Sequence, residues 1–229
     1  MRLNWPRLRR LFLIAIAVLG LGPVVLTLPL NFIQPPTTAV IMVRAAQRLA
    51  QGKKPAYPRR WVVPRSQISP NLRRAVLAAE DDRFYLHFGF DFEEIGKAIE
   101  RRQEGGRLRG ASTITQQVAK NLFLWEGRSL IRKGAEAYLT LVLELCLSKD
   151  RILDLYLNMA EWGDGVFGAE VASWTHFRKS ARSLSREEAA RLAAILPAPR
   201  RWSPYGSVAT RRAEIILGRM AYAVPRDDR

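Results

Sequence analysis

The segment GASTITQQVAKN, residues 110–121, is the most informative part of this sequence. It is dense in small polar side chains at positions where a helical protein normally places its apolar core. A helix that begins near Ser112 would also present backbone N–H groups at its N-terminus, and such groups bind anions. The segment is therefore predicted to form part of a binding or catalytic site carried by a helix.

Helical patterns continue on both sides of this segment. Ser69 followed by Pro70 is typical of a helix N-terminus, and Leu72, Val76 and Ala79 recur at helical spacing after it. The sequence contains no sustained alternation of the kind that predicts a strand. Further helices are predicted at residues 91–101, 112–123, 129–147, 149–160, 185–196 and 208–222. The predicted fold class is mainly α.

Two glycine-rich connections separate these helices. Residues 101–110 combine three glycines with four arginines, which predicts a mobile basic loop rather than a helix. That loop is either a solvated surface segment or a flap that closes over substrate phosphates. Gly163, Gly165 and Gly168 are predicted to form a tight turn after the helix at 149–160.

The N-terminal region has the composition of a membrane anchor. Residues 11–33 carry no charge and consist mostly of Leu, Ile, Val and Ala. As a helix, this segment is long enough to cross a hydrocarbon core of about 30 Å. No small-residue cleavage site follows cleanly, so we expect an uncleaved anchor rather than a signal peptide. Basic residues accumulate on the cytoplasmic side of such spans, and four precede this one: Arg2, Arg7, Arg9 and Arg10. The predicted location is the cell inner membrane, with a cytoplasmic N-terminus and a periplasmic domain.

The length of 229 residues allows one catalytic domain in addition to the anchor. The predicted divisions are a basic cytoplasmic tail at 1–10, a transmembrane helix at 11–33, a membrane-proximal linker at 34–64 and the catalytic domain at 65–225. Within the linker, the apolar residues 38–43 precede Arg44 and Arg48 and are expected to lie along the lipid interface.

The net charge of +16 extends beyond the N-terminal arginines, so the exported domain should be attracted to anionic lipid headgroups or to phosphate. Nucleic acid is not an expected partner, because the domain is predicted to be exported and the sequence has no zinc-finger, basic-zipper or RNA-binding motif. Cys146 is the only cysteine, which excludes an intrachain disulfide.

Glu80 is the first candidate for chemistry. It follows Leu72 by eight residues and Val76 by four, which places it on the apolar side of its helix. Desolvation there would raise the pKa of the carboxyl group toward neutrality, as suits a general base. The alternative is a helix end in water beside Asp81 and Asp82.

A second polar stripe follows at four-residue steps on one helix face, with Lys133 adjacent to it, and comprises Arg132, Glu136, Thr140 and Glu144. Because the rest of that helix is apolar, the stripe should face either solvent, as a ladder of ion pairs, or a cleft.

A diphosphate leaving group departs as a stable anion and needs no acid, provided that cations hold the developing charge. Lys120, Arg128, Arg132 and Lys133 form such a set of cations.

Four motifs occur in one order: EDDRFYLHFGFD at 80–91, GASTITQQVAKN at 110–121, RKGAE at 132–136 and LYLN at 155–158. Together they closely resemble the peptidoglycan glycosyltransferase family (glycosyltransferase family 51). The resemblance covers residues 60–205 and leaves no room for a transpeptidase domain, which points to the monofunctional biosynthetic transglycosylases of the family. It implies a lysozyme-like helical domain. One departure is Ala111, where the family commonly has a second glycine.

The resemblance implies polymerisation of lipid II into linear, uncrosslinked glycan strands by inverting transfer. Glu80 matches the base that deprotonates the 4-hydroxyl of the GlcNAc of lipid II, and Asp81 matches a neighbour of that base. Lys120 and Arg128 match the pair that holds the donor diphosphate. Further matches that line the cleft are Ser112, Gln117, Lys133 and Glu136, and Glu136 is predicted to be a second catalytic residue.

The family also implies a divalent cation, Mg or Mn, beside the substrate diphosphate, and no organic cofactor. The sequence shows no metal-ligand spacing, so the metal ligands are unassigned and the ion is expected to be held mostly by substrate oxygens. Expected partners are lipid II, the growing strand, inner-membrane lipids and proteins of the division or elongation machinery. Two other readings are open: a lytic, lysozyme-like enzyme that cleaves glycan, and a noncatalytic membrane-tethered scaffold.

Overall fold

A computed structural model describes residues 5–52, 59–105, 112–125, 127 and 129–223. Within these ranges the chain forms ten α-helices, three 3₁₀ turns and three short strands. The helices are α1 (Trp5–Thr27), α2 (Ala39–Ala50), α3 (Pro70–Glu80), α4 (Phe92–Gln103), α5 (Ile114–Phe123), α6 (Leu130–Cys146), α7 (Lys149–Met159), α8 (Ala169–Phe177), α9 (Arg186–Ala194) and α10 (Ser207–Arg219). The 3₁₀ turns are η1 (Leu28–Asn31), η2 (Arg65–Gln67) and η3 (Ala181–Ser183). The mainly α class is confirmed.

A small sheet was not predicted. Its strands are β1 (Arg59–Arg60), β2 (Glu161–Gly163) and β3 (Val166–Phe167), in the order β1-β3-β2. β2 and β3 are antiparallel and joined by a turn in which Gly165 has φ +72°, so the predicted tight turn is confirmed. β1 pairs with β3 in parallel from about a hundred positions upstream along the chain. Strands of two or three residues are too short to produce a detectable alternation.

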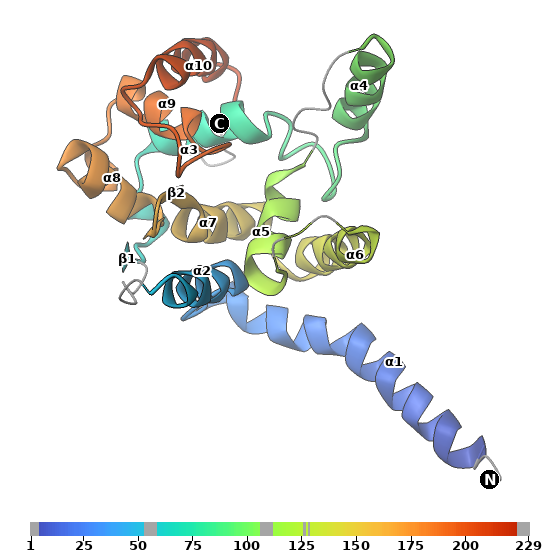
Figure 1. Ribbon diagram of the computed structural model, residues 1–229. Coiled ribbons are helices and arrows are strands. Elements are labelled where there is room, and N and C mark those ends of the chain that lie inside the picture. Colours follow the sequence, from blue (N-terminus) through green and yellow to red (C-terminus); the bar gives the residue numbers. More distant parts are fainter. Residues whose placement is uncertain (1–4, 53–58, 106–111, 126, 128, 224–229) are drawn as a thin grey trace.

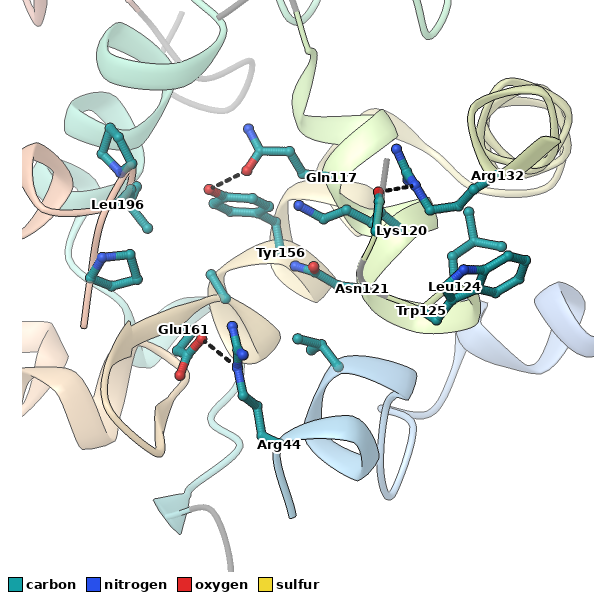
Figure 2. A pocket seen from close by; sticks show the side chains of 15 residues that line it. Arg44, Gln117, Lys120, Asn121, Leu124, Trp125, Arg132, Tyr156, Glu161 and Leu196 are labelled. Carbon is teal, nitrogen blue, oxygen red and sulfur yellow. Dashed lines mark hydrogen bonds and ion pairs between the residues drawn. The ribbon is translucent and has the colours of Figure 1, made fainter. Parts of the chain in front are cut away.

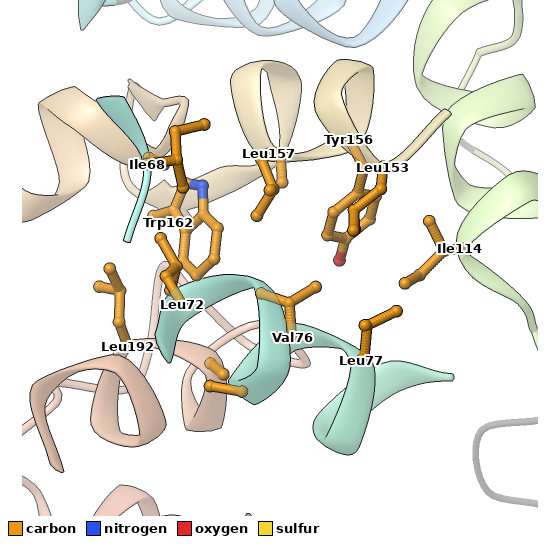
Figure 3. Close-up of a cluster of buried hydrophobic side chains, with 14 of the residues drawn as sticks. Ile68, Leu72, Val76, Leu77, Ile114, Leu153, Tyr156, Leu157, Trp162 and Leu192 are labelled. Atoms are coloured by element: carbon orange, nitrogen blue, oxygen red, sulfur yellow. The ribbon is translucent and has the colours of Figure 1, made fainter. Parts of the chain in front are cut away.

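The core lies between α3 and α7 and is closed by α5 and α9 (Figure 3). Leu72 and Val76 of α3, as predicted, and Leu77 pack against Leu153 and other apolar side chains of α7. Ala79, the third residue of the predicted stripe, is only partly buried. The largest fully buried side chain is that of Trp162 in β2. This packing fixes the C-terminal end of α3, where Glu80 lies, against the first turns of α5.

α1 projects away from the domain (Figure 1). Among the described residues it belongs to the one helical segment long and apolar enough to cross a membrane, Arg9–Asn31. The domain contacts this segment at its C-terminal half: Tyr138 Oη donates to the backbone oxygen of Gly20 at 2.7 Å, and Asn31 Nδ2 donates to that of Cys146 at 3.0 Å. The predicted N-terminal apolar helix is present.

One connection differs from the prediction, and another contains a helix that was not predicted. Residues 101–103, predicted as the start of a basic loop, continue α4 as helix. The rest of that loop at 106–110 lies outside the described residues. The interfacial segment predicted at 38–43 is the first part of α2, which Thr38 caps by accepting a hydrogen bond from the backbone N–H of Ile41.

Candidate functional site

Glu80 is the last residue of α3 and faces α5. The side-chain amide of Gln117 donates to Glu80 Oε2 at 2.9 Å, and Gln117 Oε1 accepts a hydrogen bond from Tyr156 Oη at 3.2 Å. Tyr156 is itself fully buried in the core. A chain of hydrogen bonds from the core therefore holds the Glu80 carboxylate in one orientation.

Burial raises the pKa of the Glu80 carboxyl above its usual value. The hydrogen bond from Gln117 and the charges of Arg212 and Lys120 oppose this shift, while the charge of Asp81 adds to it. The raised pKa expected from the apolar side of the helix is confirmed. Of the two neighbouring carboxylates, Asp81 is buried and only Asp82 is exposed, so this helix end is not simply solvated.

Asp81 ties the end of α3 to the beginning of α5. Its Oδ2 accepts the backbone N–H of Ile114 at 2.9 Å, and its Oδ1 lies 2.9 Å from Nε2 of His87. Thr113 and Gln116 form a capping box that satisfies two further N–H groups of the same turn. The prediction that this helix N-terminus offers donors to a substrate anion is therefore wrong for these three N–H groups, because they donate within the protein.

The cluster of Asp81, His87 and Asp91 near Glu80 does not fit a divalent cation. Ligand atoms of Asp81, His87 and Asp91 all lie within 4.8 Å of one another. Both oxygens of Asp81 are already bonded, Oδ1 of Asp91 caps α4 through the N–H groups of Glu93 and Glu94, and Oδ2 of Asp91 lies 3.5 Å from Arg83 Nε. A cation there would have to displace a helix cap and two buried hydrogen bonds.

A cleft of about 580 Å³ opens beside α5 (Figure 2). Three of the predicted substrate-binding residues line it: Gln117, Lys120 and Arg132. The wall also includes residues that sequence reasoning did not assign to the site, namely Arg44, Asn121, Trp125, Tyr156 and Glu161. Asn121 and Tyr156 lie inside the quoted motifs, whereas Arg44 and Glu161 come from segments without a motif. Arg128 lies outside the described residues.

The polar stripe of α6 supports one cation of this cleft. Arg132 Nη1 pairs with Glu136 Oε2 at 2.6 Å, and Arg132 Nε donates to the backbone oxygen of Gly127 at 2.8 Å. Lys133 pairs with the other oxygen of Glu136. The buried Glu136 thus fixes Arg132 toward the cleft without itself lining the cleft, and its catalytic role stays a prediction. Further along α6, Glu144 Oε1 accepts a hydrogen bond from Thr115 Oγ1 of α5 at 2.6 Å, which links the two helices.

A second hollow of about 400 Å³ lies on the other side of Glu80. Glu80, Asp81 and Ser112 line it together with basic residues from two further helices, Lys97 and Arg101 of α4 and Arg219 of α10. Because Gln117 lines the first cleft and bonds Glu80 in the second hollow, the candidate base lies at the boundary between the two. One side can hold a group to be deprotonated while the cations on the other side hold an anionic leaving group.

Comparison with known proteins identifies the family of this chain. The transglycosylase family model matches residues 46–221. A Rhodospirillum centenum protein named biosynthetic peptidoglycan transglycosylase is 49% identical over 218 residues, covering 94% of this chain and 92% of that protein. A Pseudomonas putida protein of the same name is 50% identical over 193 residues, covering 83% and 81%. Its namesake in Pseudomonas syringae pv. syringae is 47% identical over 201 residues, covering 87% and 85%. The chain therefore belongs to the transglycosylase family.

Proposed function

We propose that this protein polymerises lipid II into linear, uncrosslinked glycan strands of peptidoglycan. The observation that carries the proposal is the hydrogen bond between Gln117 and Glu80, which joins a base of raised pKa to a cleft lined by Lys120 and Arg132. A transferase that acts on a diphosphate-linked sugar needs this combination, because the acceptor must lose a proton while the donor releases an anion.

The reaction is a single displacement. Glu80 takes the proton of the GlcNAc 4-hydroxyl of lipid II as that oxygen attacks the anomeric carbon of the growing glycan. The bond from that carbon to the prenyl diphosphate breaks, and the diphosphate leaves with the bonding electrons. Attack from the face opposite the leaving group inverts the anomeric configuration. Lys120, Arg132 and, from the sequence motif, Arg128 would stabilise the departing charge.

A divalent cation would be held mainly by the oxygens of the diphosphate. Asp81 and Asp91 are already bonded within the protein, so no step of the reaction is assigned to a metal ion held by these two carboxylates. Mg or Mn would act by neutralising charge on the leaving group.

The protein would be anchored in the inner membrane by α1, with the domain on the periplasmic side. The exposed apolar face of α6 supports a position partly within the bilayer: Leu130 is 91% exposed and Ile131 82% exposed. The contact between Tyr138 and Gly20 places α6 beside the C-terminal half of the candidate span. Apolar side chains on this face would enter the lipid rather than face water. Proteins of the division or elongation machinery are proposed as partners on the sequence resemblance alone.

The decisive experiment incubates detergent-solubilised protein with lipid II and Mg²⁺ or Mn²⁺ and resolves the products by glycan length. We expect a ladder of uncrosslinked, lysozyme-digestible chains from the wild type and none from Glu80→Gln. The matched control is Glu214→Gln, which removes an exposed carboxylate of α10 and should polymerise normally. Polymerisation by Glu80→Gln at the wild-type rate would contradict the assignment of the base. Cleavage of preformed glycan without synthesis would favour the lytic activity, and binding without turnover the scaffold.

A further inference from the structure

Among the residues that line the cleft, Arg44 is the one positively charged residue that α2 contributes. Its side chain is only 15% exposed, and its Nε donates to Glu161 Oε2 at 3.2 Å. In Figure 2 Arg44 points into the cleft from the wall opposite Lys120 and Asn121. An anion between these walls would contact cations from α2 as well as from α5 and α6.

A neighbouring ion pair links α2 to the β2–β3 hairpin without lining the cleft. Arg48, one turn further along α2, pairs with Asp164 of the same β2–β3 hairpin at 3.1 Å. The Asp164 side chain is 64% exposed, and neither residue lines the cleft. The Arg48–Asp164 pair can therefore join α2 to the hairpin without burying a carboxylate, whereas the Arg44–Glu161 pair requires desolvation of both groups. A structural link between α2 and the hairpin therefore does not by itself explain why Arg44 and Glu161 are buried.

Glu161 is a poorly solvated counter-ion. Burial raises the pKa of its carboxyl group, and the charges of Arg44 and Arg200 only oppose that effect. An anion with more charge and more acceptor oxygens than a carboxylate would therefore compete well for Arg44. The planar guanidinium carries five N–H donors in a geometry that matches phosphate oxygens in pairs.

The position of α2 identifies the kind of anion. α2 follows the candidate membrane span, Arg9–Asn31, after a short connection, and Met42 and Leu49 are exposed on its surface. Such a helix lies at the level of the lipid headgroups. The diphosphate of a prenyl lipid is held at the same level, because its hydrocarbon chain remains in the bilayer. A residue that reaches from α2 into the cleft is placed where that diphosphate enters.

We propose that Arg44 binds the diphosphate of the prenyl-linked substrate together with Lys120 and Arg132, and that Glu161 is the counter-ion that this diphosphate displaces. This inference rests on the proposed function, since it assigns a further binding residue to the same substrate. It makes two predictions of opposite sign for the two members of one ion pair. Loss of Arg44 should weaken binding of a diphosphate, and neutralisation of Glu161 should strengthen it.

The test measures binding of farnesyl diphosphate to the full-length protein in detergent by calorimetry, alongside lipid II polymerisation. Removing one charge-assisted contact should weaken binding by about tenfold to a hundredfold, so we expect that loss for Arg44→Ala. Arg44→Lys should bind with intermediate affinity, because it keeps the charge without the paired donors. Glu161→Gln should bind more tightly than the wild type. The matched control, Arg48→Ala, breaks the other pair on the same helix and hairpin and should bind as the wild type does.

A purely structural role for Arg44 would give a different pattern. Arg44→Ala and Glu161→Gln would then lower the melting temperature together and change diphosphate affinity in the same direction, and this result would overturn the inference. Wild-type affinity for farnesyl diphosphate in a folded Arg44→Ala variant would also overturn the inference. The proposed function would stand in that case if the wild type and Arg44→Ala both polymerise lipid II. Absence of polymerisation and of diphosphate binding in the wild type would instead reject the proposed function itself. If Arg44→Ala does not fold, the affinity of Arg44→Lys decides.

Discussion

Glu80 illustrates, at the scale of one residue, how a candidate catalytic group can lower the stability of the fold. Its pKa is raised by burial in the folded protein, so the fold binds this proton more tightly than the unfolded chain does. Stability must then fall as pH rises from the usual carboxyl pKa through the raised one. We expect Glu80→Gln to melt at a higher temperature than the wild type at pH 7.5, with the difference vanishing below about pH 4. Thermal unfolding followed by circular dichroism at both pH values measures this.

The exposed carboxylate of Glu214 provides the control for that measurement, since Glu214→Gln should not change the melting temperature in a pH-dependent way. A Glu80→Gln variant that is less stable than the wild type at pH 7.5 would show that the carboxylate is well solvated in the fold. The same substitution is expected to abolish polymerisation. Stability and activity should thus change in opposite directions at this one position.

Residues of the site could be predicted when one helix or one motif contains the relevant spacing. The spacing from Leu72 and Val76 places Glu80 on the apolar face of its helix. The resemblance of the 80–91 motif to the family then favours a base over a helix end in water. The partnership of Arg44 with Glu161 could not be found in this way, because 117 positions separate them and only the tertiary fold brings them together. Helical periodicity relates residues three or four positions apart and carries no information about such pairs.

At the scale of elements, most helices of the domain were predicted, including α9 with only nine residues, whereas α2 and α8 were not. α6 and α7 lie within two residues of the predicted bounds. α8 was missed because its nine residues bury Glu170 and Ser173 together with Ala169 and Ala172, which removes the contrast between a polar and an apolar face. Its position depends instead on neighbours: Glu170 Oε2 accepts the backbone N–H of Ala181 at 2.8 Å.

The apolar face of α6 leads to a prediction about the element as a whole. If this face enters the bilayer, a fluorophore at its most exposed position should sense lipid. We expect an environment-sensitive label on Leu130→Cys, in a Cys146→Ser background, to emit at shorter wavelength in proteoliposomes than in water. The same label on Glu187→Cys of α9 is the control and should report water. Water-like emission from both positions would place α6 outside the membrane.

At the scale of the whole molecule, the proposed function requires a defined angle between anchor and domain, because the cleft would have to receive a diphosphate held at the membrane surface. Arg151 of α7 helps to fix that angle by donating to the backbone oxygens of Leu30 and Ile33, the latter at 2.7 Å. Two such hydrogen bonds contribute about 1–3 kcal/mol, enough to hold the two parts in one orientation.

We expect Arg151→Ala to lower kcat/KM for lipid II about tenfold in proteoliposomes and much less in detergent, where the substrate can approach from any direction. Arg186→Ala, which removes a bond between α9 and the backbone of Leu217, is the control and should not distinguish the two conditions. Equal losses in both media would show that Arg151 supports the fold of the domain rather than its orientation on the membrane.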